Sequence, residues 1–326
     1  MCSVGGSPAH EQGTTACLGH GLVAAGWEFT PADGDHSDHC AKVSPRVPLP
    51  PVVRPAAGRR ATLVAMSDMP VLVTGAARGI GAAVCLRLAA DGARIIALDR
   101  CSDNAALDDP LGTRRQLDEV VAGCEAAGAA SALAVEADVA DPRGLETALA
   151  GLGPFGAVVC AAGVIWGGDS VWATPPAVWE ALVGTNVTGV LNTAAVTIPQ
   201  MLGADLPHGR FVAVASAAGS RGLPSMGAYS ATKHAVVGLV RSMAADLADS
   251  GITANAVAPG STDTAKLDAS AAVYGLGSAA EFATHHTLGR LLRPEEVAEA
   301  IVWLCSPASS GVTGTVVPVD AGMTAT

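Results

Sequence analysis

The sequence predicts a doubly wound α/β domain, in which helices cover both faces of a parallel β-sheet. The first observation is a series of short, continuous apolar runs, which are typical of strands buried on both faces. The second is helical periodicity between these runs, so that strands and helices alternate along the chain. The third is composition: of the 326 residues, 50% are hydrophobic but only 3% are aromatic, which favours close packing of small side chains between helices and sheet.

We expect the first strand at 71–74, where an apolar run ends in a glycine. The first helix is expected at 80–90, and Gly92 ends it. The other strands are expected at 94–99, 132–135, 156–160, 211–215, 253–257 and 315–319. The other helices are expected at 113–127, 176–201, 229–248 and 294–304. No internal repeat is present, so residues 66–326 are interpreted as a single domain.

The first 65 residues differ from the rest, because they are rich in proline and histidine and show no helical or strand period. We expect residues 1–65 to be a disordered extension, and Met66 or Met69 to be an alternative start directly before the first strand. His36, His39 and Cys40 form a loose cluster without the spacing of a zinc site, so no metal site is predicted.

Charge and cysteine usage exclude several classes of protein. The formal net charge is −11 and no run of basic residues occurs, which argues against binding to nucleic acid or to an anionic membrane. The longest apolar stretches, such as 155–166, are broken by glycine, so we expect no membrane-spanning helix. The eight cysteines include no C-x-x-C pair, which favours reduced thiols in a cytoplasmic protein.

A glycine-rich motif lies between the first strand and the first helix. Residues 74–81 read Thr-Gly-Ala-Ala-Arg-Gly-Ile-Gly, which places Gly75, Gly79 and Gly81 at the turn. Glycine lets the backbone turn tightly and approach a pyrophosphate, and the helix that follows directs its free N–H groups at the phosphates. Asp99 follows at the end of the next strand. Together these features predict a dinucleotide-binding site.

A tyrosine and a lysine four residues apart form the second motif. Tyr229 and Lys233 share one face of a predicted helix. A free phenol has a pKa near ~10, and a neighbouring ammonium favours the phenolate, so Tyr229 is predicted to be a general base. Ser216, at the end of a strand, is placed to hydrogen-bond a substrate oxygen. The chain has only two tyrosines, so a chance pairing of this kind is improbable.

The spacing G-x-x-x-G-x-G, followed by Ser216, Tyr229 and Lys233, resembles the short-chain dehydrogenase/reductase family in its standard-length branch. The resemblance covers about 71–322 and implies a Rossmann fold, an NAD(P)-dependent oxidoreductase acting on CH–OH groups, and a homotetramer. It implies that Asn186 bends its helix and holds a water linking Lys233 to solvent, which completes a catalytic set of Asn186, Ser216, Tyr229 and Lys233. The implied cofactor-binding residues are Gly75, Arg78, Gly79, Ile80, Gly81, Asp99, Asp138, Val139, Ala162, Gly163, Tyr229, Lys233, Pro259, Gly260 and Thr264.

One segment departs from the family pattern. Where the family often has Asn-Asn-Ala-Gly after the fourth strand, this chain has Cys160, Ala161, Ala162 and Gly163. In the family that asparagine mainly ties strands together, so its loss puts local hydrogen bonding in doubt more than catalysis.

The choice between NAD and NADP depends on three side chains. The carboxylate of Asp99 can accept hydrogen bonds from both ribose hydroxyls, whereas a 2′-phosphate would meet like charge there. Arg78 and Arg100 favour the opposite choice, because arginines beside this position can pair with phosphate. Asp99 occupies the discriminating strand end, so we expect NAD.

Residues 100–130 form a longer link between the second and third strands than the family usually has. With the segments 214–219, 233–240 and 274–276, this insertion resembles the mycofactocin-coupled branch of the family. The resemblance implies that NAD is held without exchange and that mycofactocin, a peptide-derived redox cofactor, accepts the electrons. The insertion lies beside the adenosine half of the predicted site and is suited to bury the cofactor; the alternative is a surface elaboration.

A substrate lid is expected at about 261–288, because this segment joins the sixth strand to the helix at 294–304. Its apolar residues include Leu267, Tyr274 and Phe282, and they favour a small apolar alcohol over a phosphorylated substrate. His285 and His286 are candidates for substrate contact, or else exposed histidines of the lid.

The function predicted from these features is an NAD-dependent alcohol dehydrogenase or ketone reductase that acts on a primary or secondary alcohol. A 3-oxoacyl-thioester reductase is the alternative within the same chemistry, although no basic docking segment for an acyl carrier protein is apparent. A non-catalytic NAD sensor is the alternative of another class, and it would need the glycine motif but not the four catalytic residues.

Overall fold

The computed structural model describes residues 69–325 apart from residues 205 and 207. The expectations about the extension at 1–65, its alternative start and the cluster of His36, His39 and Cys40 lie outside these residues.

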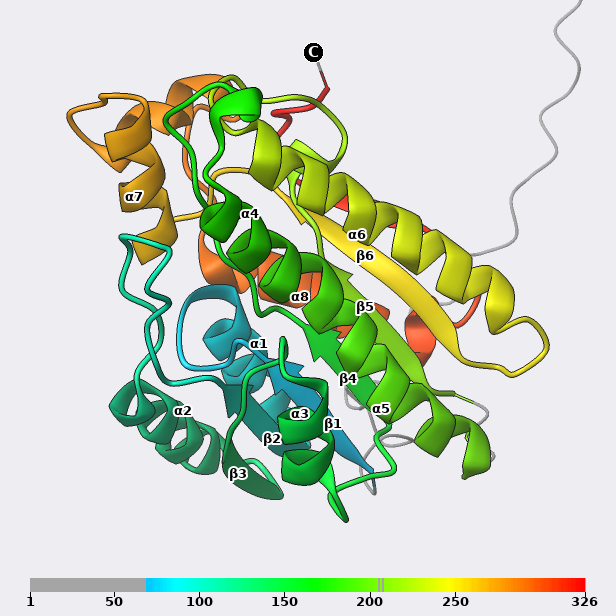
Figure 1. Cartoon of the computed structure of the whole chain (residues 1–326). Helices are drawn as coiled ribbons and strands as arrows, with labels where there is room; N and C mark the ends of the chain where they lie inside the picture. The colour runs from blue at the N-terminus through cyan, green and yellow to red at the C-terminus, as the bar shows by residue number, and fades with distance from the viewer. Residues whose placement is uncertain (1–68, 205, 207, 326) are drawn as a thin grey trace, which may run out of the picture. The chain divides into compact units, whose positions relative to one another are not determined.

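Seven strands form one sheet in which all neighbouring strands are parallel (Figure 1). The strand order is β3-β2-β1-β4-β5-β6-β7, so the order reverses between β1 and β4, where ligands bind in doubly wound sheets. The strands are β1 (Pro70–Thr74), β2 (Arg94–Asp99), β3 (Ser131–Glu136), β4 (Ala157–Cys160), β5 (Arg210–Val214), β6 (Thr253–Pro259) and β7 (Val316–Val319).

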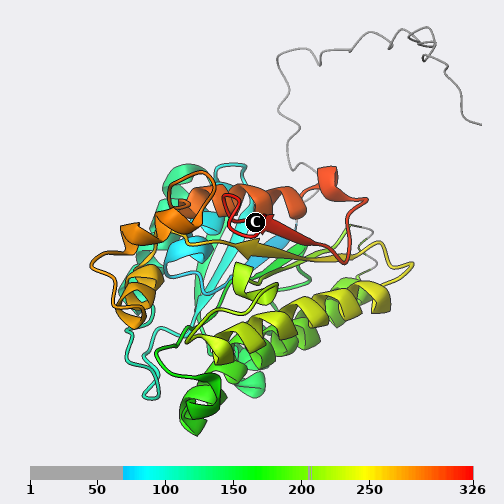
Figure 2. The same cartoon turned by 90° about the horizontal axis from the view of Figure 1, so that it is seen from above.

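Helices cover both faces of the sheet, as the view along its edge shows (Figure 2). One face carries α1 (Gly79–Ala89), α2 (Arg114–Ala127) and α8 (Pro294–Leu304). The other carries α3 (Pro142–Leu149), α5 (Gly189–Gly203) and α6 (Gly227–Asp246). Two further helices, α4 (Pro176–Val183) and α7 (Ala265–Val273), lie toward the carboxyl ends of the strands. Short 3₁₀ turns occur at Val171–Ala173, Ala217–Gly219, Ala279–His285 and Pro307–Ser309.

The alternation of side chains along β1 explains why the core has two layers. Val71 and Val73 pack into the layer with α1, α2 and α8, whereas Leu72 packs into the layer with α3, α5 and α6. All three side chains are fully buried. Because successive side chains of a strand point to opposite faces, a strand covered on both sides must be apolar throughout.

The predicted fold class is confirmed, and each predicted strand and helix is present with small shifts at its ends. The helix α3 was not predicted, although its start has the expected signals: the Asp141 side chain accepts from the Arg143 N–H, and Pro142 is the first helical residue. The helix predicted at 176–201 is interrupted, because a π-helical turn at Gly184–Thr188 separates α4 from α5.

The helical run Pro176–Gly203 is long and apolar enough to cross a membrane by length and composition alone, which the sequence prediction overlooked. Its residues Val190, Ala194 and Met201 are buried against the sheet. The apolar character of this run therefore serves the protein core.

Candidate active site

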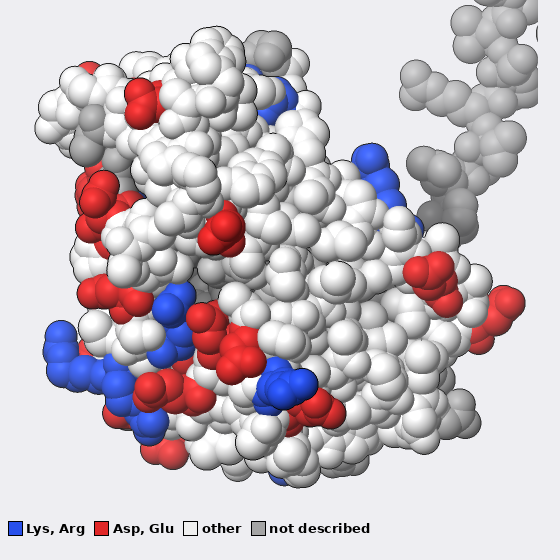
Figure 3. Space-filling view, viewed as in Figure 1, with Lys and Arg blue, Asp and Glu red and all other residues white. Residues whose placement is uncertain are grey.

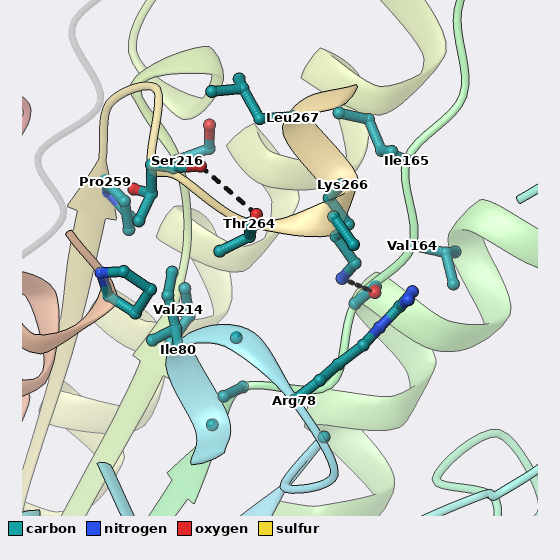
Figure 4. Close-up of a pocket in the computed structure, with 18 of the residues that line it drawn as sticks. Arg78, Ile80, Val164, Ile165, Val214, Ser216, Pro259, Thr264, Lys266 and Leu267 are labelled. Atoms are coloured by element: carbon teal, nitrogen blue, oxygen red, sulfur yellow. Dashed lines mark hydrogen bonds between the residues drawn. The ribbon is translucent and has the colours of Figure 1, made fainter. Parts of the chain in front are cut away.

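A cleft of about 980 Å³ lies at the carboxyl ends of the strands. It extends from the start of α1 past the ends of β4 and β5 to the 261–288 segment, and Figure 4 shows side chains from each of these parts facing one another. Of the residues predicted from the sequence, the lining includes Gly75, Arg78, Gly79, Ile80, Gly81, Asp99, Asp138, Val139, Ala162, Gly163, Ser216, Tyr229, Lys233, Pro259, Gly260 and Thr264. Asn186 lies behind the lining and is 1% exposed.

The glycine-rich turn is shaped by close backbone approaches. Gly75 has φ +68°, and a Cβ there would lie 2.6 Å from the backbone of Ala162. A Cβ on Gly81 would collide with the carbonyl oxygen of Gly75. No side chain caps the N–H groups at the start of α1. These free N–H groups line the cleft beside glycines that leave no side chain in the way. The start of α1 therefore fits a pyrophosphate.

Thr74 makes the connection for which the family pattern uses an asparagine. The Ala161 N–H donates to the Thr74 carbonyl at 3.2 Å, and the Ala162 N–H donates to the Thr74 hydroxyl at 3.3 Å. The ends of β1 and β4 are thus tied together without an asparagine.

Asp99 is fixed under the turn and is 8% exposed. Its Oδ2 accepts from the Ala77 N–H at 3.0 Å, and its Oδ1 accepts from the Cys101 N–H at 3.3 Å. Both arginines near it have other contacts. The Arg78 guanidinium donates to the Pro110 carbonyl at 2.7 Å, and Arg100 pairs with Asp138 at 3.4 Å.

The insertion after β2 packs into the cleft, so we call residues 100–113 the strap. Leu111 and Leu107 of the strap belong to a small apolar cluster with Trp166 and Tyr229. A Cβ on Gly112 would lie 3.0 Å from Asp99 Oδ1, which shows how closely the strap covers this carboxylate. The strap is therefore part of the wall of the cleft.

Three predicted catalytic side chains meet between β5 and α6. The Lys233 ammonium donates to the carbonyl of Val214 at 2.8 Å and lies 5.8 Å from the centroid of the Tyr229 ring. Ser216 directly follows the end of β5, and its Oγ accepts from the Ala218 N–H at 3.1 Å. A hydrogen bond between Ser216 and Tyr229 lowers the pKa of the phenol.

Burial is the largest influence on the electrostatics of this group. Burial raises the pKa of Tyr229 more than the Ser216 hydrogen bond lowers it. Burial, and then the charge of Lys266, lower the pKa of Lys233 to about 7. Lys233 is not among the causes of the Tyr229 pKa shift, so its role in favouring the phenolate together with the nicotinamide ring stays a prediction.

Asn186 lies in the π-helical turn and joins two parts of the site. Its Nδ2 donates to the Val164 carbonyl at 2.9 Å and to the Thr232 hydroxyl at 3.0 Å. Its Oδ1 accepts from the Val164 N–H at 2.8 Å. The side chain thus fixes the loop after β4 to the helix that carries Tyr229, and one lone pair of Oδ1 is left for a water.

The 261–288 segment forms the wall of the cleft opposite the sheet. The Tyr274 hydroxyl donates to the Pro224 carbonyl at 2.7 Å, and the Tyr274 ring packs edge-on against Phe282. His285 lines the cleft, but His286 is buried. The Nε2 of His286 accepts from the Ser261 N–H, and its Nδ1 is hydrogen-bonded to the Arg290 carbonyl. Because both ring nitrogens are engaged, His286 is a structural residue rather than a candidate for substrate contact.

Comparison with known proteins agrees with this geometry. Residues 75–324 match the family model described as enoyl-(acyl carrier protein) reductase. The chain belongs to the short-chain dehydrogenase/reductase family. It is 35% identical over 267 residues to an uncharacterized NAD-dependent oxidoreductase of Mycobacterium tuberculosis, covering 77% of this chain and 94% of that protein.

Two solved structures are similar to this short-chain dehydrogenase/reductase. One is carveol dehydrogenase from Mycobacterium avium in complex with NAD, with TM-score 0.75, 30% identity, and coverage of 80% of this chain and 99% of that one. The other is a 3-oxoacyl-[acyl-carrier protein] reductase from Brucella melitensis with bound NAD, with TM-score 0.68, 29% identity, and coverage of 79% and 92%.

Sequence reasoning missed three contributors to the site of this short-chain dehydrogenase/reductase. Thr74 replaces an asparagine through its hydroxyl, which only the register of β1 against β4 reveals. Leu111 reaches the cleft through the path of the strap. Lys266 carries the only ammonium of the 261–288 segment, and this isolation in an alanine-rich stretch was the available signal.

Gly81→Ala is expected to destabilise this short-chain dehydrogenase/reductase by about 1–3 kcal/mol, because the added methyl meets the Gly75 carbonyl and the turn must shift. Urea unfolding measures the change. Gly203→Ala is the matched control, since it also lies in a helix and its Cβ would meet nothing within 4 Å. Equal stability of the two variants would contradict the assigned crowding at the turn.

Proposed function

We propose that this protein is an NAD-dependent dehydrogenase that interconverts an alcohol and a carbonyl compound by hydride transfer. The observation that carries this proposal is the meeting of Ser216, Tyr229 and Lys233 at one end of a cleft whose other end fits a dinucleotide.

The cofactor end fits NAD better than NADP. The buried carboxylate of Asp99 stands where a 2′-phosphate would meet like charge. The two arginines that could attract such a phosphate are bonded to Pro110 and Asp138 instead. The NAD found in the two similar solved structures supports the same choice.

NAD supplies the hydride acceptor when it is bound. The residues of the chain handle the substrate oxygen and its proton. The Ser216 hydroxyl orients the alcohol oxygen, and the phenol oxygen of Tyr229 takes the proton in oxidation and returns it in reduction. Lys233 provides positive charge beside the phenol when it is protonated, and Asn186 keeps α6 and the loop after β4 in register.

The substrate end favours an apolar alcohol. We propose that 261–288 is the substrate lid, because Leu267, Tyr274 and Phe282 bring apolar surface to the cleft. The carveol dehydrogenase relationship supports an alcohol as substrate.

A 3-oxoacyl-thioester reductase is the second candidate, favoured by the similar Brucella melitensis structure. In the view of Figure 3 most basic side chains lie beside α2 and α3, and only a small basic patch is visible near the top of the molecule. That distribution gives an acidic acyl carrier protein little to dock on at the substrate end of this face. A panel of alcohols and 3-oxoacyl thioesters, assayed with the same enzyme, separates the two candidates.

The strap supports a finer proposal, that NAD is held tightly and is reoxidised in place by mycofactocin. Arg78 fastens the strap to the glycine-rich turn, and Gly112 lies against Asp99. A cofactor beneath the strap would exchange slowly, because release requires these contacts to open.

Assembly and location are also proposed. Exposed apolar side chains such as Trp179, Leu191 and Trp303 support association into a homotetramer. The five cysteines described by the structure are free, which supports a reducing compartment such as the cytoplasm.

Tyr229→Phe is expected to lower kcat by roughly 10²- to 10⁴-fold, because the group that accepts the proton is lost. Binding of NAD, measured by calorimetry, is expected to stay within about twofold. Tyr274→Phe removes the other tyrosine hydroxyl and one hydrogen bond to Pro224, so it is expected to change kcat by less than about tenfold. Retained turnover in Tyr229→Phe would remove the proposed base.

Asp99→Ala is expected to weaken NAD binding by roughly 10- to 100-fold, since hydrogen bonds to a charged group are lost, and to relax the preference over NADP. The ratio of kcat/KM for the two cofactors measures this. Asp99→Asn keeps an acceptor for the Ala77 N–H and removes only the charge, so it separates the fold of the turn from cofactor choice. Better turnover of the unaltered enzyme with NADP would overturn the assignment.

The proposed slow exchange predicts that the protein purified without added cofactor contains NAD, detectable by mass spectrometry after denaturation. Turnover with an artificial electron acceptor is then expected to exceed turnover with soluble NAD. A cofactor-free preparation that turns over freely with soluble NAD would contradict both the retention and the coupling to mycofactocin.

A further inference from the structure

Lys266 is a partly buried lysine that the proposed proton transfer does not use. It is the second residue of α7, and its Nζ donates to the carbonyl oxygen of Gly163 at the end of β4. The side chain therefore spans the cleft from the lid to the sheet, as Figure 4 shows. Its pKa is lowered to about 8, first by burial and then by the charge of Arg78.

Positive charge gathers at this point. A Cβ on Gly163 would lie 3.5 Å from the Lys233 Nζ and 3.9 Å from the Lys266 Nζ, so the two ammonium groups approach one place. The Arg78 side chain extends toward the same place in Figure 4. Within the described part of the chain, no carboxylate forms an ion pair with any of these three side chains.

Lys233 is buried, and Lys266 and Arg78 are partly buried. Cations that are withdrawn from water without paired carboxylates are costly unless an anion joins them. Asp99 and Asp109 favour the charged form of Lys266 from a distance, but the only hydrogen bond that its ammonium makes within the described residues is to the Gly163 carbonyl. A carbonyl dipole compensates an ammonium less than an anionic oxygen does. The cluster is thus prepared for a ligand that carries negative charge.

The start of the lid lies over the start of α1. A Cβ on Gly79 would lie 3.4 Å from the Thr264 side chain, and Gly79 is the first residue of that helix. Lys266 follows two residues later and lines the same cleft as the first residues of α1. Two independent features, a helix start without a side-chain cap and a cluster of cations, therefore line one cleft.

Resting on the proposed function, we propose that Lys266 is a ligand of the NAD pyrophosphate, and that its ammonium exchanges the Gly163 carbonyl for a phosphate oxygen when the cofactor binds. This contact fastens the lid to the cofactor. Leu267 and Tyr274 lie on the same helix or directly after it and line the substrate end, so the cofactor sets the position of the substrate wall.

A purely structural role for Lys266 predicts the opposite change in NAD affinity when the lysine is removed. If Lys266 served only to hold the lid on the Gly163 carbonyl, its removal would open the cleft, and NAD would bind as tightly as before or more tightly. If Lys266 binds the pyrophosphate, its removal weakens binding.

The test is the dissociation constant of NAD and of ADP-ribose for the full chain, measured by calorimetry. Lys266→Met is expected to weaken the binding of both ligands by roughly 10- to 100-fold, because a charge-assisted hydrogen bond is lost. Adenosine, which lacks the pyrophosphate, is expected to bind the variant and the unaltered protein within about twofold. Arg115→Met is the matched control, since it removes the same charge from an exposed position on α2.

Lys266→Arg keeps the charge and is expected to bind NAD at least about fivefold more tightly than Lys266→Met. This second variant tests the role of the charge even if the methionine variant is less stable. Hydrogen exchange of 265–288 reports on the lid: NAD is expected to slow exchange in the unaltered protein and much less in Lys266→Met. Equal or tighter NAD binding by Lys266→Met would overturn the proposal for Lys266 alone. Any copurified NAD is removed from all variants before the titration. Failure of the cofactor-free unaltered protein to bind NAD or ADP-ribose would instead overturn the proposed function.

Discussion

The site depends on the close approach of two backbones at the point where the strand order reverses. Gly75, after β1, lies so near Ala162, after β4, that a single methyl on the glycine would collide. The Thr74 hydroxyl and carbonyl hold the two strand ends together from beneath. This contact turns the chain toward α1, which leaves the helix start open to the cleft. The strap, Asp99 and the lid are then placed around that opening.

Burial of the ionisable side chains limits how much charge the protein can supply to the site by itself. Lys233 and Lys266 are each lowered in pKa, to about 7 and about 8, and Tyr229 is raised. The buried site thus disfavours the ammonium of each lysine and the phenolate of the tyrosine. A dinucleotide has both an anionic pyrophosphate and a positive nicotinamide ring when oxidised, so its two ends offset these penalties in the appropriate places.

The alternation of strands and helices could be predicted from sequence because β1 and its neighbours are buried on both faces and so must be apolar throughout. The glycine-rich turn and the Tyr229–Lys233 pair could be predicted because each needs particular residue types at fixed spacing. The role of Thr74, the path of the strap and the reach of Lys266 depend on contacts between segments far apart in the chain. The pKa of Tyr229 could not be predicted either, because the penalty of burial acts on the phenol and on the lysine beside it, and spacing gives no measure of burial.

The π-helical turn between α4 and α5 changes which residues of one continuous helical path face inward. Val178 and Leu182 of α4 face the apolar cluster around Tyr229, whereas Val190 and Ala194 of α5 face the sheet. A π-helical turn holds more residues than an α-helical turn, so it rotates the residues after it relative to those before it. Asn186 lies in this turn and is buried where α4 and α5 meet. A single wide turn therefore joins the helix that packs around Tyr229 to the helix that packs on the sheet, and the same turn carries the amide that connects the loop after β4 to α6.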